Sequence, residues 1–348
     1  MYSYKIFNSV NEECKNIWKK VETNSYSNFF QSFDFIQEII NKDKLNVKIV
    51  FIFDKNEIIA ILPLEIKKYF IFNVLQWIGT NYADYCNPLL ANNIEDLDKD
   101  TFLKTWKAIL NDLGKIDLIF LNKQLTYIQD VENPFIKFFK TSLFSKIYLI
   151  ELKNKFDDYK EEIKKKDKKH HYEVHRTLLK LEKLKNLYSY KFSVKNSFEN
   201  NINFKEIIKT KIDTLNKKNK LNSFFIDVFE NLITLNKIRF LSMEIKVNEQ
   251  VMSKCFSFIY KNIFYYYIPT IYSKDFNNYK PGKVLIIEII KWCILNNIKK
   301  FDFGLGEENY KKHFSNKVIY MHRYLKFITL KGIILYSIIK IVLSFKKL

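Results

Sequence analysis

Glycine, proline and cysteine are all scarce in this 348-residue chain, which contains six, five and four of them. So few glycines and prolines exclude collagen-like and low-complexity classes. The cysteines have no C-x-x-C spacing, which predicts reduced core thiols and a cytosolic, metal-free protein. Residues 1–5 lead into no apolar run, so we expect no signal peptide.

Three familiar signatures of catalytic and metal-binding sites are also missing. The chain has no P-loop pattern and no G-x-S-x-G, which removes the motif evidence for nucleotide hydrolysis and for a serine triad. His170, His171 and His175 share a helical stretch, but there is no H-E-x-x-H pattern. Because flanking lysines repel a cation, we predict no metal site.

Hydrophobic residues and positive charge are abundant. Hydrophobic residues make up 47% of the chain, which is enough for the cores of two domains. Lys and Arg total 58 against 38 Asp and Glu, giving a formal net charge of +20. This charge favours an anionic partner, such as a nucleotide cofactor, nucleic acid or a membrane surface. The densest basic segment, residues 153–185, predicts a helix with one core face and one solvated basic face.

Residues 263–314 form the most informative stretch. Aromatic and β-branched residues predict a strand at 263–272, in which Pro269 marks a bulge, an edge or a splayed pair. A buried helix is expected at 284–295 and a return strand at 299–303, followed by a polar loop with two glycines. Polar groups at the C-terminal end of such a strand are typical of sites in α/β folds.

The buried helix is preceded by a loop of Lys280, Pro281, Gly282 and Lys283. A glycine-containing loop at a helix N-terminus offers backbone N–H groups and the positive end of the helix dipole, which suits a pyrophosphate. The two lysines strengthen this interpretation. A plain turn before a helix is the simpler alternative.

Motifs in both halves of the chain resemble one known family. The order Y-x-P-G-x-x-L (residues 279–285), a buried helix and F-D-F-G-x-G-x-E-x-Y-K (301–311) is similar to the C-terminal half of CelD-like acyltransferases in the GNAT superfamily. In the first half, F-Q-S-x-x-F (30–35) and D-Y-C-N-P (84–88) resemble that family's N-terminal half. CelD-like proteins are similar to Fem-type aminoacyl transferases, which contain two GNAT-like halves. The resemblance spans residues 26–325.

The resemblance implies an α+β (mixed α/β) fold of two tandem GNAT-like halves, the acyl-CoA N-acyltransferase fold. We place the N-terminal half at residues 1–150, the C-terminal half with the cofactor loop and catalytic cluster at 151–330, and an amphipathic tail at 331–348. Periodicity across 204–303 predicts two helices, a hairpin, a strand, a helix and a strand, which is the GNAT order. In the first half we expect a helix capped by Ser32 and a hairpin at 47–66.

The resemblance also implies the site. Pantetheine would lie between the strands at 263–272 and 299–303, with the pyrophosphate of acetyl-CoA or another acyl-CoA on Lys280, Pro281, Gly282 and Lys283. The residues predicted to be catalytic are Asp302, Tyr310 and Lys311, and those predicted to bind the acceptor are Asp84, Tyr85, Glu307 and Glu308. For Asp302 a strand-end cap, and for Asp84 a polar turn, are equal alternatives.

Three functions fit these features. The first is transfer of an acyl group, acetyl in the simplest case, from acyl-CoA to an amine of an amino sugar or amino acid in cell-surface polysaccharide biosynthesis. The second is Fem-type transfer from aminoacyl-tRNA to a peptidoglycan precursor, which would use the basic helix at 153–185. The loop at 280–283 is shorter than the glycine-rich loop of typical GNAT enzymes, which weakens the case for acetyl-CoA. The third is a non-enzymatic basic module for nucleic acid or membrane, which leaves the carboxylates, tyrosine and lysine after Phe301 unused.

Residues 332–348 form an apolar tail that Lys340 interrupts and Lys346 and Lys347 close. The tail is too short and too charged for a confident transmembrane span. A helix docked on the protein's own surface is the simpler interpretation, and an interfacial helix on an anionic membrane is the alternative. We therefore expect a cytoplasmic protein, peripheral at the inner face of the membrane under the alternative.

Overall fold

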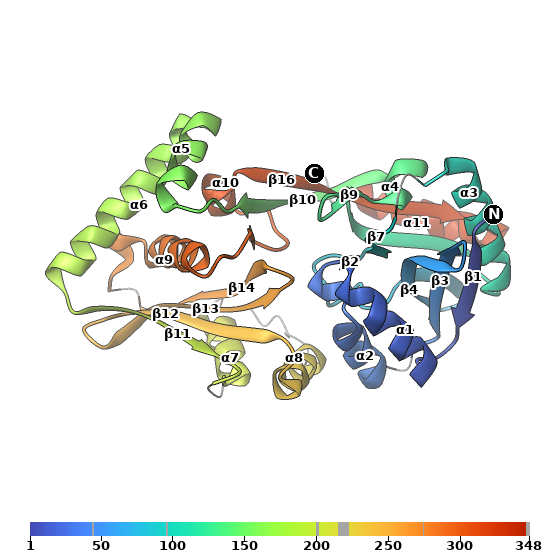
Figure 1. Cartoon of the computed structure of the whole chain (residues 1–348), viewed down its shortest axis with the longest axis horizontal. Coiled ribbons are helices and arrows are strands. Elements are labelled where there is room, and N and C mark those ends of the chain that lie inside the picture. The colour runs from blue at the N-terminus through green and yellow to red at the C-terminus, as the bar shows by residue number, and fades with distance from the viewer. Residues whose placement is uncertain (44, 95–96, 200–201, 215–222, 274, 346–348) are drawn as a thin grey trace. The chain divides into compact units, whose positions relative to one another are not determined.

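The computed structural model describes residues 1–348 except 44, 95–96, 200–201, 215–222, 274 and 346–348. The chain forms two compact units, each with its own strands and helices (Figure 1). Unit 1 comprises Met1–Ser145 and Tyr320–Leu348, and unit 2 comprises Lys146–Ile319. Strands β10 (Ser142–Glu151) and β16 (Lys317–Phe327) carry the chain from one unit to the other.

Unit 1 is built on a sheet with the strand order β1-β3-β4-β5-β7-β16. Neighbouring strands are antiparallel except β5 and β7, which run parallel. The predicted hairpin at 47–66 is confirmed by β3 and β4. The bounds are β1 Ser3–Phe7, α1 Glu12–Thr23, β2 Ser25–Tyr26, α2 Phe33–Lys42, β3 Val47–Asp54, β4 Glu57–Tyr69, β5 Phe72–Trp77, β6 Leu89–Ala91, α3 Lys99–Asp112, β7 Leu118–Leu125, β8 Tyr127–Ile128, β9 Val131–Glu132, α4 Pro134–Phe138 and α11 Leu330–Phe345.

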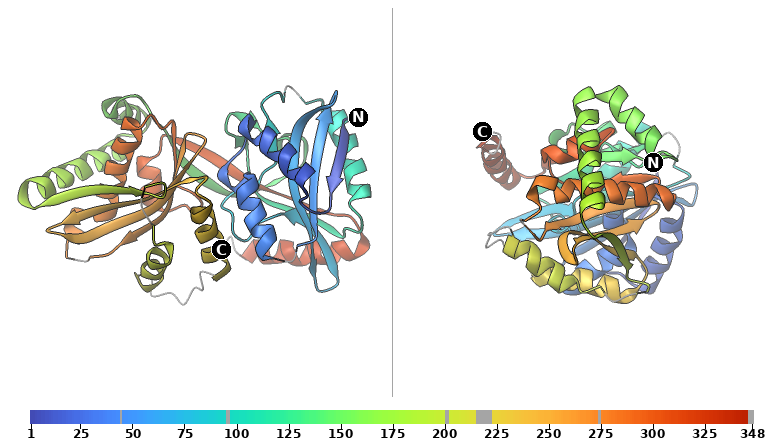
Figure 2. Two further views of the ribbon diagram at one scale, coloured as in Figure 1. Left: turned by 60° about the horizontal axis from the view of Figure 1, so that its bottom comes forward. Right: turned by 90° about the vertical axis from the view of Figure 1, so that its left-hand side faces the viewer.

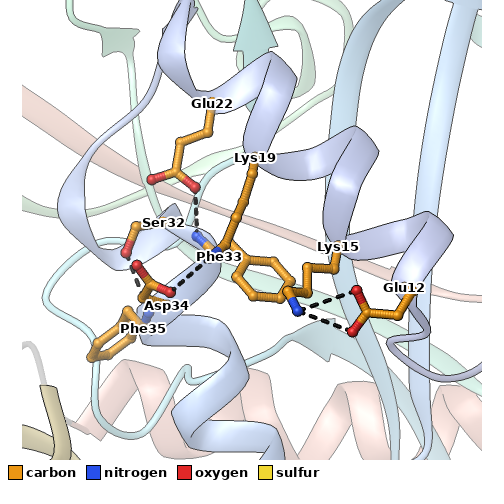
Figure 3. A network of polar contacts seen from close by, with 8 residues as sticks. All are labelled: Glu12, Lys15, Lys19, Glu22, Ser32, Phe33, Asp34 and Phe35. Carbon is orange, nitrogen blue, oxygen red and sulfur yellow. Dashed lines mark hydrogen bonds and ion pairs between the residues drawn. The ribbon is translucent and has the colours of Figure 1, made fainter. Parts of the chain in front are cut away.

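Helices α1 and α2 are tied together by groups that cap α2 (Figure 3). The Ser32 hydroxyl accepts a hydrogen bond from the Phe35 N–H at 3.3 Å, which confirms Ser32 as the predicted N-cap. Glu22, near the end of α1, accepts from the Phe33 N–H at 2.7 Å. Two of the N–H groups that a helix N-terminus leaves without backbone partners are thereby satisfied.

Unit 2 is built on a sheet with the strand order β10-β15-β14-β13-β12-β11. Helix α9 lies on one face of this sheet together with α5 and α6, and α7 and α8 lie on the other (Figure 1). The helix, helix, hairpin, strand, helix, strand order predicted for 204–303 is confirmed. The bounds are α5 Phe156–Lys166, α6 Lys168–Leu187, β11 Tyr190–Asn196, α7 Phe204–Thr214, α8 Ser223–Leu235, β12 Arg239–Val247, β13 Gln250–Tyr260, β14 Ile263–Ile271, α9 Pro281–Leu295, β15 Lys300–Asp302 and α10 Asn309–Phe314.

The basic segment predicted as one helix at 153–185 consists of two helices, α5 and α6. Asp167 separates them with an extended backbone, φ −161°, and its carboxylate accepts the Lys169 N–H at 2.8 Å. The prediction of a continuous helix is wrong because aspartate in this conformation is a favoured N-cap and begins a new helix.

The strands of the two units share one arrangement. In unit 1, three antiparallel strands, β3, β4 and β5, are followed in sequence by helix α3 and then by β7, which pairs parallel with β5. In unit 2, the antiparallel strands β12, β13 and β14 are followed by helix α9 and then by β15, which pairs parallel with β14. A strand from the other end of each unit's chain, β16 or β10, then pairs antiparallel with β7 or β15. The two halves are therefore related in topology, although the sequence shows no repeat.

Helix α11 belongs to unit 1 and packs on β5 and β7. Its start fits closely against the sheet, since a Cβ at Gly332 would come within 1.9 Å of the Asp117 carbonyl oxygen. The Asp117 carboxylate also accepts from the Thr329 hydroxyl at 2.7 Å. Within the described part of the chain, no helix is both long enough and apolar enough to cross a membrane.

Candidate active site

Strands β14 and β15 of unit 2 pair over only three residues, ending at Tyr265 and Asp302. Beyond Tyr265, β14 continues to Ile271 and pairs only with β13 among the described strands. Tyr267 is an extra residue in that pairing, because Phe256 and Ser257 lie opposite Ile268 and Tyr266. Such a bulge bends its strand. The irregularity predicted at Pro269 is therefore present two residues earlier, in the part of β14 that extends beyond its pairing with β15.

The corresponding strands of unit 1 are bridged by the chain itself. Strands β5 and β7 pair parallel at only two positions, after which residues 83–87 hydrogen-bond to β7. These bonds run from the Cys86 N–H to the Lys123 carbonyl at 3.0 Å, from the Lys123 ammonium to the Ala83 carbonyl at 2.7 Å, and from the Leu125 N–H to the Asn87 side chain at 2.8 Å. An extended cofactor therefore fits the strand edge in unit 2 better than the one in unit 1.

The predicted acceptor residues Asp84 and Tyr85 lie in this bridging segment of unit 1. The Tyr85 ring is fully buried, 5.6 Å from the Phe30 ring, and the Tyr85 carbonyl accepts from the Gln31 amide at 3.0 Å. Asp84 is half-buried. The F-Q-S and D-Y motifs of the first half are therefore in contact, and Tyr85 contributes packing there.

Helix α9 begins at Pro281, so the predicted cofactor loop is its N-cap and first turn. Lys280 has a left-handed φ of 54°, and its carbonyl accepts from the N–H groups of Lys283 and Val284 at 2.9 and 3.1 Å. Pro281 has no N–H. Among residues 280–284 of the described chain, Gly282 alone has a backbone N–H that makes no hydrogen bond. The start of α9 therefore offers one backbone donor to an anion.

Side-chain cations surround that helix start. Burial, followed by the charges of Lys280, Arg176 and Lys283, lowers the pKa of the Lys180 ammonium. Lys283 lies 2.9 Å from Glu173, and this hydrogen bond lowers the pKa of that carboxyl. Like charges gathered beside a helix N-terminus are stabilised by a bound polyanion. Sequence reasoning missed Arg176 and Lys180, although their spacing on α6 places them on one helical face.

Asp302, predicted to be catalytic, ends β15 and is 4% exposed. Its Oδ1 accepts a hydrogen bond from the Gly304 N–H at 2.7 Å. This is the contact of a strand-end cap, in which an aspartate bonds the backbone two residues onward. Asp302 therefore holds the start of the following loop, whatever further part it takes in a reaction.

Tyr310 and Lys311 lie on the short helix α10, where the sequence predicted a loop. That prediction is wrong because the turn is closed by the Lys311 N–H, which donates to the Glu308 carbonyl at 3.0 Å. Lys311 is 3% exposed, and its ammonium donates to the Leu305 carbonyl at 2.7 Å and lies 2.9 Å from the Glu308 carboxylate. Burial and the Glu308 charge raise the pKa of Tyr310, so its hydroxyl stays protonated at neutral pH.

The loop between Asp302 and α10 is folded back on itself. Gly306 has φ +120°, and a Cβ there would meet the Glu308 carboxylate at 2.5 Å, so glycine allows Glu308 to reach Lys311. Glu307 points elsewhere and lies 3.3 Å from Lys146 on β10. The structure thus gathers Asp302, Glu307, Glu308, Tyr310 and Lys311 at one end of β15, and we call these residues the 302–311 cluster.

Two of the five histidines meet next to this cluster. The rings of His170 on α6 and His313 on α10 lie 5.1 Å apart, and burial lowers the pKa of both. Among the described residues, no group of three or more His, Cys, Asp or Glu side chains is arranged to hold a metal ion.

Comparisons with known proteins agree with this geometry. Residues 168–312 match the family model of the acetyltransferase (GNAT) domain, a range that contains the α6 and α9 cations and the 302–311 cluster. A search of curated proteins gave no match. Among solved structures, FemX is similar with a TM-score of 0.55 at 10% identity, covering 96% of this chain and 99% of that one.

Two further solved structures have the same overall fold. A conserved protein of unknown function from Bacteroides thetaiotaomicron gives a TM-score of 0.51 at 10% identity, over 93% of this chain and 99% of that one. A tandem GNAT protein from the clavulanic acid biosynthesis pathway gives 0.50 at 5% identity, over 93% and 98%. The chain therefore has the mixed α/β fold of two tandem GNAT-like halves that the sequence predicted, and residues 168–312 of the second half match the GNAT acetyltransferase domain.

Proposed function

We propose that the protein is an N-acyltransferase that moves an acyl group, acetyl in the simplest case, from acyl-CoA to an amine of an amino sugar or amino acid. One observation carries the proposal: unit 2 combines a strand β14 that continues past the end of its pairing with β15, a cationic start of α9 and the 302–311 cluster. The amino-sugar or amino-acid acceptor and a place in cell-surface polysaccharide biosynthesis rest on the CelD-like motifs alone.

The donor would bind along β14 and at α9. The amides of pantetheine suit the edge of β14 beyond Tyr265, since an extended chain can pair with a strand edge. The pyrophosphate would contact the Gly282 N–H and the ammonium groups of Lys180, Lys280 and Lys283. One backbone donor with several flexible cations suits a polyphosphate whose charge matters more than its exact shape.

The chemistry needs a base and an acid at the end of β15. The acceptor nitrogen attacks the thioester carbonyl carbon, the new C–N bond replaces the C–S bond, and the amine proton passes to a carboxylate. Asp302 is our first candidate for that base, with Glu307 and Glu308 behind it. Tyr310, protonated at neutral pH, would return a proton to the leaving thiolate, and Lys311 would counter the negative charge that develops on the carbonyl oxygen.

A Fem-type reaction is the second candidate, in which aminoacyl-tRNA replaces acyl-CoA and a peptidoglycan precursor is the acceptor. The single free N–H at the start of α9 favours it, because a short first turn with proline offers less to a pyrophosphate than a glycine-rich loop does. The basic face of α5 and α6 would then meet the tRNA backbone. Both donors are cytoplasmic molecules, so we place the reaction in the cytoplasm.

Thermal unfolding in the presence of each donor separates the two candidates. We expect acetyl-CoA and CoA to raise the unfolding temperature, and the variant Lys280→Met/Lys283→Met to lose most of that shift. The matched control Lys237→Met/Lys261→Met removes the same charge from other positions of unit 2 and should respond like the wild type. A shift with aminoacyl-tRNA alone would favour the Fem-type reaction, and no shift with either donor would contradict both.

A further inference from the structure

Helix α11 of unit 1 is apolar on its outer face as well as on the face that packs against the sheet. The inner side, which includes Gly332, contacts β5 and β7. On the outer side, apolar residues recur every four positions at Leu330, Ile334, Ile338 and Val342, and they are 83%, 58%, 50% and 49% exposed. A helix that only covers its own sheet has polar residues on its solvent-facing side. The folding of unit 1 therefore gives no reason for apolar residues on the outer side of α11.

The tip of the β4–β5 hairpin is the second exposed apolar element of unit 1. Its two-residue turn is Phe70 and Ile71, which are 94% and 64% exposed. Phe70 has a left-handed φ of 54°, a conformation that favours Gly or Asn and strains a bulky aromatic residue. The four other two-residue hairpin turns in the described chain are polar: Lys55 and Asn56, Gln129 and Asp130, Asn248 and Glu249, and Lys261 and Asn262.

The turn and the helix are neighbours within unit 1. Asn73, three residues beyond Phe70, exchanges backbone and side-chain hydrogen bonds with Asp117, and Asp117 holds Thr329 immediately before α11. Three residues of strand span about 10 Å. The left panel of Figure 2 shows the light-blue hairpin and the red helix at the same end of the unit.

Apart from the buried Asp117 carboxylate, the charged residues in and next to both elements in sequence are basic. The hairpin tip follows Lys67 and Lys68, and the sequence contains no acidic residue after Glu308. The basic residues of the C-terminal segment of unit 1 are Arg323, Lys326, Lys331, Lys340, Lys346 and Lys347. A second copy of this surface would bring like charges together, whereas anionic lipid headgroups complement them and the acyl region accepts the apolar side chains.

We propose that unit 1 docks on an anionic lipid bilayer through both elements, with the outer stripe of α11 and the Phe70 turn inserted at the headgroup boundary. Aromatic and aliphatic side chains flanked by lysines are the composition of such interfacial segments. Two anchoring points in one unit hold a protein more firmly than one helix, because insertion of the first makes insertion of the second intramolecular. This inference is independent of which donor unit 2 uses.

Flotation with lipid vesicles tests the proposal. The full-length protein should bind vesicles of phosphatidylcholine with about one third phosphatidylglycerol, and binding to phosphatidylcholine alone should be much weaker. Phe70→Ser/Ile71→Ser and Ile334→Ser/Ile338→Ser should each reduce the affinity for anionic vesicles by roughly tenfold or more. Leu295→Ser, an 81% exposed position at the end of α9 in unit 2, is the matched control and should bind like the wild type.

Circular dichroism and the unfolding temperature should be unchanged in all three variants, because the substituted side chains face solvent. The proposal is overturned if the wild type does not float with anionic vesicles, or if both double variants bind them as well as Leu295→Ser does. Concentration-dependent self-association of the wild type that these variants abolish, without vesicle binding, would assign the surface to a second copy instead.

Discussion

Replacing Lys311 with methionine tests whether a buried positive charge in unit 2 serves a reaction or only supports a loop. The ammonium lies 2.7 Å from the Leu305 carbonyl oxygen and 2.9 Å from the Glu308 carboxylate, and the residue is 3% exposed. Methionine is similar in length and packs flexibly. The change therefore removes the charge and its hydrogen bonds while leaving most of the packing in place.

The two possible roles differ in magnitude. Loss of the hydrogen bond to Leu305 costs about 1–2 kcal/mol, and loss of the ion pair to Glu308, whose side chain is 55% exposed, costs at most about 1 kcal/mol. Relief of the buried charge offsets part of this. We expect the unfolding free energy to fall by about 1–2 kcal/mol, and kcat to fall by about 10²-fold if the charge stabilises the transition state.

The assay measures thermal unfolding, CoA affinity by calorimetry, and acyl transfer to a panel of amines. The companion variant Glu308→Gln keeps a hydrogen-bond acceptor beside Lys311 but removes the ion pair, so its unfolding free energy isolates the share of the Lys311→Met loss that the ion pair contributes. A Lys311→Met variant with normal CoA affinity and normal kcat would refute a catalytic role. The residue would then be a structural brace for the loop from Gly304 to Glu308.

Three further predictions concern other parts of unit 2. In a thermal-shift titration, CoA at a hundredfold excess over Kd should stabilise the wild type by roughly 2.7 kcal/mol. Gly282→Val should abolish this stabilisation, because a branched side chain blocks the approach of the backbone to phosphate. An unchanged shift in the variant would remove the start of α9 from the cofactor site. Asp302→Asn should flatten the pH–rate profile if that carboxylate is the base, whereas an unchanged rate with lower stability would leave only the cap to Gly304. Lys283 holds the pKa of the Glu173 carboxyl below its ordinary value of 4.5, so this carboxylate stabilises the fold above pH 4.5 and stops doing so as the pH falls through its lower folded pKa. When the pH is lowered from about 5 to about 3, the unfolding free energy of Glu173→Gln should therefore fall less than that of the wild type. Equal losses would contradict the pairing of Glu173 with Lys283.

Local chemistry made much of this fold predictable. The Ser32 cap, the hairpin turns and the buried helix before the 302–311 cluster each depend on residues close in sequence, and the structure confirms them. The break at Asp167 was missed because basic residues on both sides continue the helical pattern. The short helix α10 was missed because six residues give too little periodicity to detect.

The site was less predictable than the fold. A lysine is rarely buried, so nothing in the sequence marked Lys311 as an internal brace, and its burial depends on Leu305 and Glu308 folding back over it. The contact between the motifs at Phe30 and Tyr85 also joins distant parts of the chain. The boundaries drawn at residues 150 and 330, the CelD-like assignment and the roles given to individual site residues stay predictions.

Strand β16 and helix α11 give unit 1 a particular order of assembly. Unit 1 takes the strand that pairs with β7 and the helix that covers Asp117 from residues after 320, whereas unit 2 is complete at residue 319. During synthesis the chain emerges from its N-terminus, so unit 2 can close while unit 1 still has an open β7 edge. Synthesis must therefore proceed through β16 and α11 before the first half of the protein can be completed, and a chain that stops before β16 leaves its oldest part unfinished.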